Sequence, residues 1–293
     1  MADKSSKTHG AREGHDGGRE ENELRGYASS PCYLHELEPS YRDDLAAEDG
    51  VLRNSIAVDD GDELNFCSTC AFSSACLDRG YDKSRLRDLH VLVEHIGPFR
   101  EGQHIFREGD PFNAIAAIRA GTVKTYVTDL EGREQVQGFF LPGEVIGLSA
   151  ISQSRFPCNA VALETVLLCR FSFPKMATLA AQMPGLQEQL FRLLSLDIGK
   201  AALLAPDFRA EERLAAFLLI LSQRYAAVGL SERRIRLAMS RTDIANYIRL
   251  APETVSRILK RFQQEALISV DRREVEILDM DRLRAIARSV LRK

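Results

Sequence analysis

The chain has 293 residues, of which 45% are hydrophobic, and its formal net charge at pH 7 is -3. This length predicts about two domains. No apolar run approaches the ~20 residues that a membrane-spanning helix needs, so we expect no membrane association. The first residues lack the apolar stretch of a secretory signal. We therefore expect a cytoplasmic protein whose six cysteines stay reduced, which favours ligation over disulfide formation.

The charge is divided unevenly along the chain. Residues 1–60 carry 14 acidic and 7 basic side chains, a net charge of -7, whereas residues 206–293 carry 18 basic and 12 acidic side chains, a net charge of +6. The basic C-terminal region indicates contact with a polyanion, with a merely solvated basic surface as the alternative. Because the few apolar residues of 1–60 follow no sustained period, we expect a largely disordered acidic extension there.

Three cysteines lie within ten residues in the next segment, residues 61–80, which we call the cysteine arm. They are Cys67, Cys70 and Cys76. Thiolates this close bind a metal ion or an iron–sulfur cluster, or they form disulfides. The spacing by itself leaves these possibilities open.

The region after the arm reads as a β-rich domain, residues 81–183. A short amphipathic helix is expected first, at Asp82–Ile96, because apolar residues recur there at helical spacing. Short β-rich runs then alternate with glycine turns, which is typical of a β-sandwich or β-roll. The runs are His104–Arg107, Ala114–Arg119, Thr122–Thr128, Gln135–Leu141, Ala160–Leu163 and Val166–Phe173.

A long helix is expected at residues 184–205, opened by Pro184 and closed by Pro206. Its apolar residues cover more than the one face that a surface helix buries against its own domain. The helix is therefore either sandwiched within the chain or paired with its copy in a homodimer, and we expect the homodimer. The candidate dimer residues are Leu190, Leu194, Ile198 and Ala201.

Residues 206–293 show the order helix, short turn, helix and hairpin, which indicates a winged helix-turn-helix. A capping box is expected at Ser240–Asp243, and Pro252 is suited to a first helical position. The expected elements are helices at Ala210–Ala227, at Ser240–Ile248 and at Glu253–Gln264, followed by a two-stranded ribbon at Ile268–Val270 and Val275–Ile277.

The helix at Glu253–Gln264 is expected to read DNA with its N-terminal residues. Arg257 can bind guanine O6 and N7 together, Glu253 can accept from cytosine N4, and Ser256 can pair with either kind of group. The alternative is that Glu253 and Arg257, four residues apart, form only a surface ion pair. Phosphate contacts, which add affinity without sequence information, are assigned to Lys260, Arg261 and Arg241.

Several motifs together resemble one known family over residues 67–285. They are the Cys-x2-Cys-x5-Cys cluster, Gly109-Asp110, Arg119–Lys124, Pro142–Gly147, Ala210–Phe217, Ser240–Tyr247 and Glu253–Arg257. On these motifs the chain resembles the CRP/FNR family of bacterial transcription regulators, and within it the FNR branch of oxygen-responsive activators.

The resemblance implies an α+β chain with a sensory β-roll like a cyclic-nucleotide-binding jelly roll, a long dimerisation helix and a winged DNA-binding domain. It also implies a [4Fe-4S] cluster held by Cys67, Cys70, Cys76 and a fourth cysteine, for which the motif matches Cys169 rather than Cys158. In the family oxygen degrades the cluster, the dimer weakens and DNA binding is lost. The implied DNA site is TTGAT-N4-ATCAA, and RNA polymerase is an implied partner.

The chain departs from the family pattern at three places. Relatives that bind cyclic nucleotides have an Arg-Ser pair where this chain has Phe156-Pro157, and Glu144 alone cannot hold an anionic nucleotide, so no cyclic-nucleotide response is expected. The FNR prototype has an acidic residue where this chain has Ala201, so the dimer should be favoured and the oxygen switch set differently. Arg249 replaces a turn glycine.

Two other functions fit part of the pattern. Four thiolates would also suit a structural zinc ion in a DNA-binding protein of the same fold, although the chain has one Cys-x2-Cys knuckle rather than two. A dithiol redox enzyme would need Cys67 and Cys70 at a helix N-terminus in a βαβ setting, which the surrounding sequence lacks. Phosphate-binding and nucleophile motifs are also missing, so we expect no enzyme.

Overall fold

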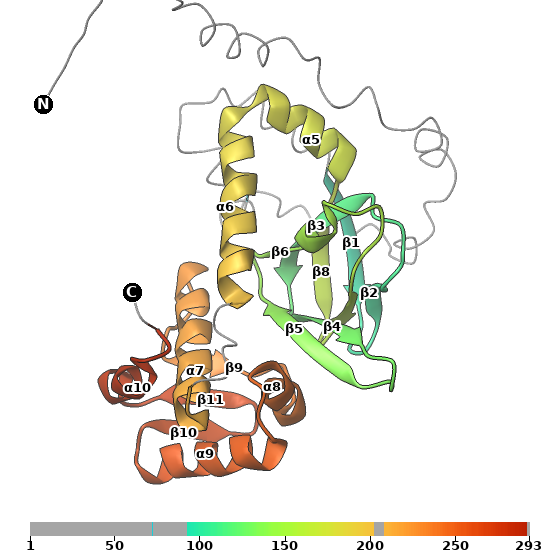
Figure 1. Ribbon diagram of the computed structural model, residues 1–293. Helices are drawn as coiled ribbons and strands as arrows, with labels where there is room; N and C mark the ends of the chain where they lie inside the picture. The colour runs from blue at the N-terminus through green and yellow to red at the C-terminus, as the bar shows by residue number, and fades with distance from the viewer. Residues whose placement is uncertain (1–71, 73–92, 202–207, 292–293) are drawn as a thin grey trace, which may run out of the picture. The chain divides into compact units, whose positions relative to one another are not determined.

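The computed structural model of the chain describes residue 72, residues 93–201 and residues 208–291 (Figure 1). The expected acidic extension and the arm cysteines Cys67, Cys70 and Cys76 lie outside the described residues, as do the side chains of Ile198 and Ala201. Within the described ranges, no helix is both long and apolar enough to cross a membrane.

The N-terminal domain is a β-roll of two four-stranded antiparallel sheets, which confirms the predicted fold class. The first sheet has the order β1 (Val93–Phe99), β8 (Val166–Ser172), β3 (Ala114–Ala120), β6 (Val145–Ile146), and the second has the order β2 (His104–Phe106), β7 (Asn159–Ala162), β4 (Val123–Thr128), β5 (Glu134–Phe140). Strand β5 therefore lies at an edge. Apart from β1 and the two-residue β6, each strand lies within two residues of its predicted bounds.

The helix expected at Asp82–Ile96 is wrong over its last four residues. Those residues form the start of β1, with Val93 opposite Phe171 and Ile96 opposite Leu168 of β8. The partner strand lies more than seventy residues away in sequence, so the local period could not reveal the pairing. Residues 82–92 lie outside the described part of the chain. Helix α5 (Phe173–Gln182) was also not predicted.

A position that favours glycine lies two residues before strand β4. Gly121 has φ 83°, and a Cβ atom there would lie 2.2 Å from the carbonyl oxygen of Thr165. The next residue, Thr122, donates from Oγ1 to Glu164 Oε1 at 2.7 Å. These contacts hold the chain just before β4, in which Lys124 is 8% exposed.

Helix α6 (Pro184–Ala201) is the described part of the expected dimer helix. Leu190 and Leu194 are half-buried against the core of the roll in their own chain. Phe191 and Leu196 are instead 62% and 54% exposed. Helix α6 thus packs only partly on the roll and leaves large apolar side chains exposed.

The C-terminal domain is a winged helix-turn-helix, as predicted. Its elements are α7 (Ala210–Ala227), β9 (Arg234–Arg236), α8 (Arg241–Tyr247), α9 (Pro252–Gln264), β10 (Ile268–Asp271), β11 (Glu274–Ile277) and α10 (Met280–Ala287). The expected two-stranded ribbon is a three-stranded sheet, because β9 pairs with β11. At three residues, β9 is too short to show an alternating pattern, and α10 was not predicted.

Candidate nucleic-acid interface and cysteine site

Helix α9 separates an apolar face from a polar face. The side chains of its apolar face are 4% exposed or less and form the domain core; they are Val255, Ile258, Leu259 and Phe262. Glu253, Ser256, Arg257 and Lys260 are all exposed on the other side. Helical periodicity therefore brings the four predicted DNA-contacting residues of α9, three for bases and Lys260 for phosphate, onto one solvent-facing surface.

This polar face makes few contacts within its own chain. Across the described ranges, the side chains of Glu253, Arg257 and Lys260 form no hydrogen bond or ion pair, so the surface-pair alternative for Glu253 and Arg257 is not realised. Ser256 donates to the carbonyl oxygen of Pro252 at 3.0 Å. An external partner would thus meet one carboxylate and two cations close together.

Arg261, a predicted phosphate contact, forms ion pairs within the C-terminal domain. Its guanidinium lies 2.5 Å from Glu211 of α7 and 3.5 Å from Glu265. The hydrogen bond from Arg261 lowers the pKa of Glu211 against the opposing effect of burial. Arg261 therefore holds α9 to α7 in this structure, and its role toward phosphate stays a prediction.

The predicted capping box at the start of α8 is confirmed. Ser240 Oγ accepts from the Asp243 amide at 3.0 Å, and the Ser240 amide donates to Asp243 Oδ2 at 3.2 Å. The next residue, Arg241, is half-buried and donates to the carbonyl oxygen of Arg272 at 3.4 Å, in the turn of the wing. Arg241 therefore joins the start of α8 to the turn of the wing.

The turn between α8 and α9 is stabilised by a side chain from α7 that was not predicted. Arg249 has φ 55°, and the Leu250 amide donates to the Ala245 carbonyl oxygen at 2.8 Å, the pattern of a Schellman helix end that usually contains glycine. Arg213 of α7 donates to the carbonyl oxygens of Ile248 at 3.0 Å and Arg249 at 3.3 Å. Sequence reasoning missed Arg213, because its partners are backbone atoms thirty-five residues away.

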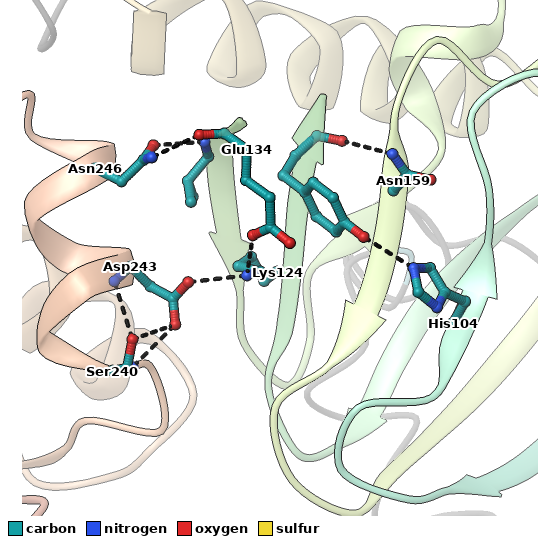
Figure 2. Close-up of polar contacts among 9 residues, drawn as sticks. His104, Lys124, Glu134, Asn159, Ser240, Asp243 and Asn246 are labelled. Carbon is teal, nitrogen blue, oxygen red and sulfur yellow. Dashed lines mark hydrogen bonds and ion pairs between the residues drawn. The ribbon is translucent and has the colours of Figure 1, made fainter. Parts of the chain in front are cut away.

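Helix α8 is bonded directly to the edge of the roll (Figure 2). The Asn246 carboxamide donates to the Glu134 carbonyl oxygen at 2.7 Å and accepts from the Val136 amide at 2.8 Å, so it makes two bonds that a neighbouring strand would make to edge strand β5. Lys124 Nζ lies 2.8 Å from both Asp243 Oδ1 and Glu134 Oε2. We call this set of five residues the α8–β5 contact.

The charges in the α8–β5 contact stabilise each other. Burial alone would lower the pKa of Lys124, but its hydrogen bonds to Asp243 and Glu134 raise it. Burial would raise the pKa of Asp243, but hydrogen bonds from Lys124 and Ser240 lower it. A lowered acidic pKa gives stability that is lost only as pH falls through that value, and a raised lysine pKa gives stability that is lost only as pH rises through it. Lys124 and Asp243 are therefore both charged at neutral pH.

Glu144 has a partner that the sequence did not suggest. Arg224 of α7 donates from Nε to Glu144 Oε1 at 2.7 Å and from Nη2 to Oε2 at 2.5 Å. Burial would lower the pKa of Arg224, but Glu144 holds it above the ordinary value. Phe156 is 4% exposed and stacks on Phe106 with ring centroids 3.9 Å apart. Both rings belong to the buried core of the roll.

The two described cysteines lie in different surroundings. Cys158 lines a cavity of about 350 Å³ together with Arg224 and Tyr247. Cys169 is buried in β8, opposite His95 of β1 and Ala117 of β3. Within residue 72 and residues 93–201 and 208–291, no group of three or more His, Cys, Asp or Glu side chains could hold a metal ion.

Phe72, the described residue of the cysteine arm, contacts the strand that contains Cys169. It is 1% exposed, and its ring packs edge-on against Phe171 with centroids 5.1 Å apart. Cys169 and Phe171 are two residues apart in β8, so their side chains project from the same face of the sheet. Phe72 therefore packs on β8 at the face from which Cys169 projects.

Comparisons with known proteins agree with both domains. A family model described as a cyclic nucleotide-binding domain matches residues 97–183, and one described as a Crp-like helix-turn-helix domain matches residues 212–286. Among solved structures, FixK2 from Bradyrhizobium japonicum has a TM-score of 0.60 and 25% identity, with 66% of this chain and 96% of that chain covered.

Similar curated proteins include the transcriptional activator protein anr of Pseudomonas aeruginosa, which is 42% identical over 75% of this chain and 92% of the relative. The anaerobic regulatory protein of Haemophilus influenzae is 41% identical over 74% of this chain and 86% of the relative. The chain therefore belongs to the FNR branch of the CRP/FNR family, a family of DNA-binding transcription regulators and not of enzymes.

Proposed function

We propose that this protein is a homodimeric, cytoplasmic regulator of oxygen-limited transcription that binds TTGAT-N4-ATCAA-like DNA when Cys67, Cys70, Cys76 and Cys169 hold a [4Fe-4S] cluster. The observation that carries the DNA-binding part is the exposed face of α9, where Glu253, Arg257 and Lys260 have no hydrogen-bonding or ion-pair partner among the described residues. RNA polymerase is the partner that an activator of this family would engage.

The chemistry of that face suits a mixed G·C and A·T half-site. Arg257 presents a planar pair of donors for guanine O6 and N7, and Glu253 presents an acceptor for cytosine N4. Lys260 and the half-buried Arg241 would hold phosphates on either side and fix the register of the helix in the major groove.

The Phe72–Phe171 contact supports Cys169 as the fourth thiolate. A chain spans at most about 3.5 Å per residue, so Cys70 lies within about 7 Å of Phe72 and Cys76 within about 14 Å. Both thiolates can therefore reach the strand that contains Cys169. Four thiolates are the usual ligand set of a [4Fe-4S] cluster, and bound together they would tie the arm to β8.

The exposed apolar side chains of α6 support dimerisation. Phe191 continues, at spacings of three and four residues, the predicted stripe of Leu194, Ile198 and Ala201, which is the pattern of a helix pair. Phe191 is 62% exposed, and burying it against a second copy would remove a large apolar surface from water. Ala201 would place no charge at this crossing, so the dimer would be favoured.

The contacts of Glu144 and Phe156 support the absence of a cyclic-nucleotide response. Glu144 is already neutralised by Arg224 at 2.5 Å, and the buried Phe156 ring offers no donor to a phosphate. A nucleotide would have to displace an internal ion pair without gaining a cation.

Anaerobic purification followed by a DNA titration tests the proposal. Iron with acid-labile sulfide and a brown colour is expected, whereas a colourless zinc protein would favour the structural-zinc alternative. Binding to TTGAT-N4-ATCAA should be lost after exposure to air. Replacing Cys169 with Ser should abolish the bound iron, and the matched control Cys158→Ser should keep it. The reverse result would make Cys158 the ligand.

A further inference from the structure

We propose that Lys124, Asp243 and Asn246 are positioning residues for DNA binding. They hold the helix-turn-helix against strand β5 of the roll, and thereby set which spacing between two half-sites the dimer accepts. The inference rests on the proposed binding to paired half-sites and deepens it. None of the three residues belongs to the face that would touch DNA.

The α8–β5 contact restrains rotation as well as distance. Asp243 and Asn246 are three residues apart, so they share one face of α8. The Asn246 carboxamide bonds to β5 through both its oxygen and its nitrogen, and Lys124 bonds to Asp243 and Glu134 at once (Figure 2). Two separated attachment points on a helix of seven residues leave it little freedom to turn.

An apolar layer supports these polar bonds. Val136, Phe139 and Leu141 of the roll belong to the same buried cluster as the core of the helix-turn-helix. The Phe139 ring packs edge-on against Tyr247 at the end of α8, with centroids 5.2 Å apart. The roll thus supplies part of the core of the DNA-binding domain, so the α8–β5 contact adjoins a buried apolar interface.

The restraint on α8 extends to α9. The turn between them is closed by the Schellman bonds and by the hydrogen bonds from Arg213 to the carbonyl oxygens of Ile248 and Arg249. Glu253, Arg257 and Lys260 remain exposed in this arrangement. The α8–β5 contact therefore orients the reading face without covering it.

A fixed orientation matters because two reading helices must enter the major groove about one helical turn, roughly 34 Å, apart. A dimer whose reading domains are held firmly binds one spacing much better than its neighbours. A dimer whose DNA-binding domains rotate freely gains less affinity from any one spacing. Its second reading helix is then no longer held in position for the second half-site. Spacing selectivity is thus the property that this contact should control.

The test compares the full-length, cluster-loaded protein with Lys124→Met and Asn246→Ala. The control is Arg133→Gln, which removes one cation from the same β4–β5 hairpin at a side chain that is 71% exposed. Affinities are measured under anaerobic conditions for inverted half-sites separated by three to six base pairs, and for a single half-site. Unfolding curves and iron content are recorded for each variant.

We expect the unmodified protein and Arg133→Gln to prefer one spacing. Lys124→Met and Asn246→Ala should lose about tenfold or more of that preference, while single half-site binding and iron content stay unchanged. Lys124→Arg, which keeps the cation, should restore most of the preference. If Lys124→Met does not fold, Asn246→Ala decides, because it removes no charge.

If folded Lys124→Met or Asn246→Ala keeps the preference for one spacing, the proposed function still stands and the inference is overturned. Tighter binding by these variants also overturns it, because the contact would then oppose DNA binding. If the unmodified, iron-loaded protein binds none of the paired sites, the proposed function fails and the inference falls with it.

Discussion

The two helices of the helix-turn-helix use their polar faces in different ways. Helix α8 bonds its polar face to the roll, through Asp243 and Asn246, and closes its own start with Ser240. Helix α9 leaves Glu253 and Arg257 exposed, and these make no ion pair or hydrogen bond within the described residues. Both helices bury their other face in the same core.

The difference shows how a small domain can be held firmly and still read an external partner. Charges that are bonded internally cannot easily serve a ligand, because each bond would have to be broken first. Charges left in water cost the fold little and remain available. In the proposed function, positioning and DNA reading would therefore be carried by adjacent helices rather than mixed on one.

The largest effect on stability should come from the buried core to which α8 and α9 both contribute. Replacing Phe262, which is 0% exposed, with Ala should lower the free energy of unfolding by about 3–5 kcal/mol through lost burial and a cavity. Lys260→Ala on the opposite face should change it by less than about 0.5 kcal/mol. Urea unfolding measures both, and similar effects would mean that the two faces are wrongly assigned.

The next largest effect concerns reading by α9. Arg257→Ala should weaken binding to the proposed DNA site by about 1–3 kcal/mol, roughly 5- to 150-fold, and relax the preference at one base pair. Arg284→Ala is the matched control, because Arg284 is exposed on α10 and pairs with Asp281. An equal loss of affinity for every DNA sequence would instead indicate that Arg257 contacts a phosphate.

A smaller effect on stability is expected from the N-cap residues, which differ between α8 and α9. Ser240→Ala removes the side-chain cap of α8 and should cost about 1 kcal/mol of stability, whereas Ser240→Thr should retain most of it. The N-cap residue of helix α9 is Ala251, which provides no side-chain cap, so Ala251→Ser should be neutral or slightly stabilising. Thermal unfolding of the three variants checks this, and an unchanged Ser240→Ala protein would refute the role of the cap.

The smallest expected effect lies in the turn that joins the helices. Arg249 has φ 55°, a conformation that strains residues with a Cβ atom. Arg249→Gly relieves this strain but adds freedom to the unfolded chain, so we expect a net gain of about 0.5 kcal/mol. Arg249→Ala keeps the Cβ atom and should bring no gain. Equal gains from both would trace the effect to the side chain rather than the backbone.

Local patterns predicted the parts of this molecule that depend on neighbours in sequence. The capping box at Ser240–Asp243 and the apolar period of α9 follow from residues three or four positions apart, and both are confirmed. The strand β1 was mistaken for the end of a helix because its identity depends on β8. The short strand β9 was missed for the same reason, since only its pairing with β11 makes it a strand.

The sequence by itself determined the family, the β-roll, the winged helix-turn-helix and the surface of α9 that would meet DNA, because periodicity and motif spacing are local properties. Only the tertiary structure decided that Lys124 bonds to Asp243, that Asn246 completes the edge of β5, and that Phe72 reaches the strand of Cys169. These contacts join residues about 100 positions apart. Whether such residues meet depends on how whole elements pack, which no local pattern encodes.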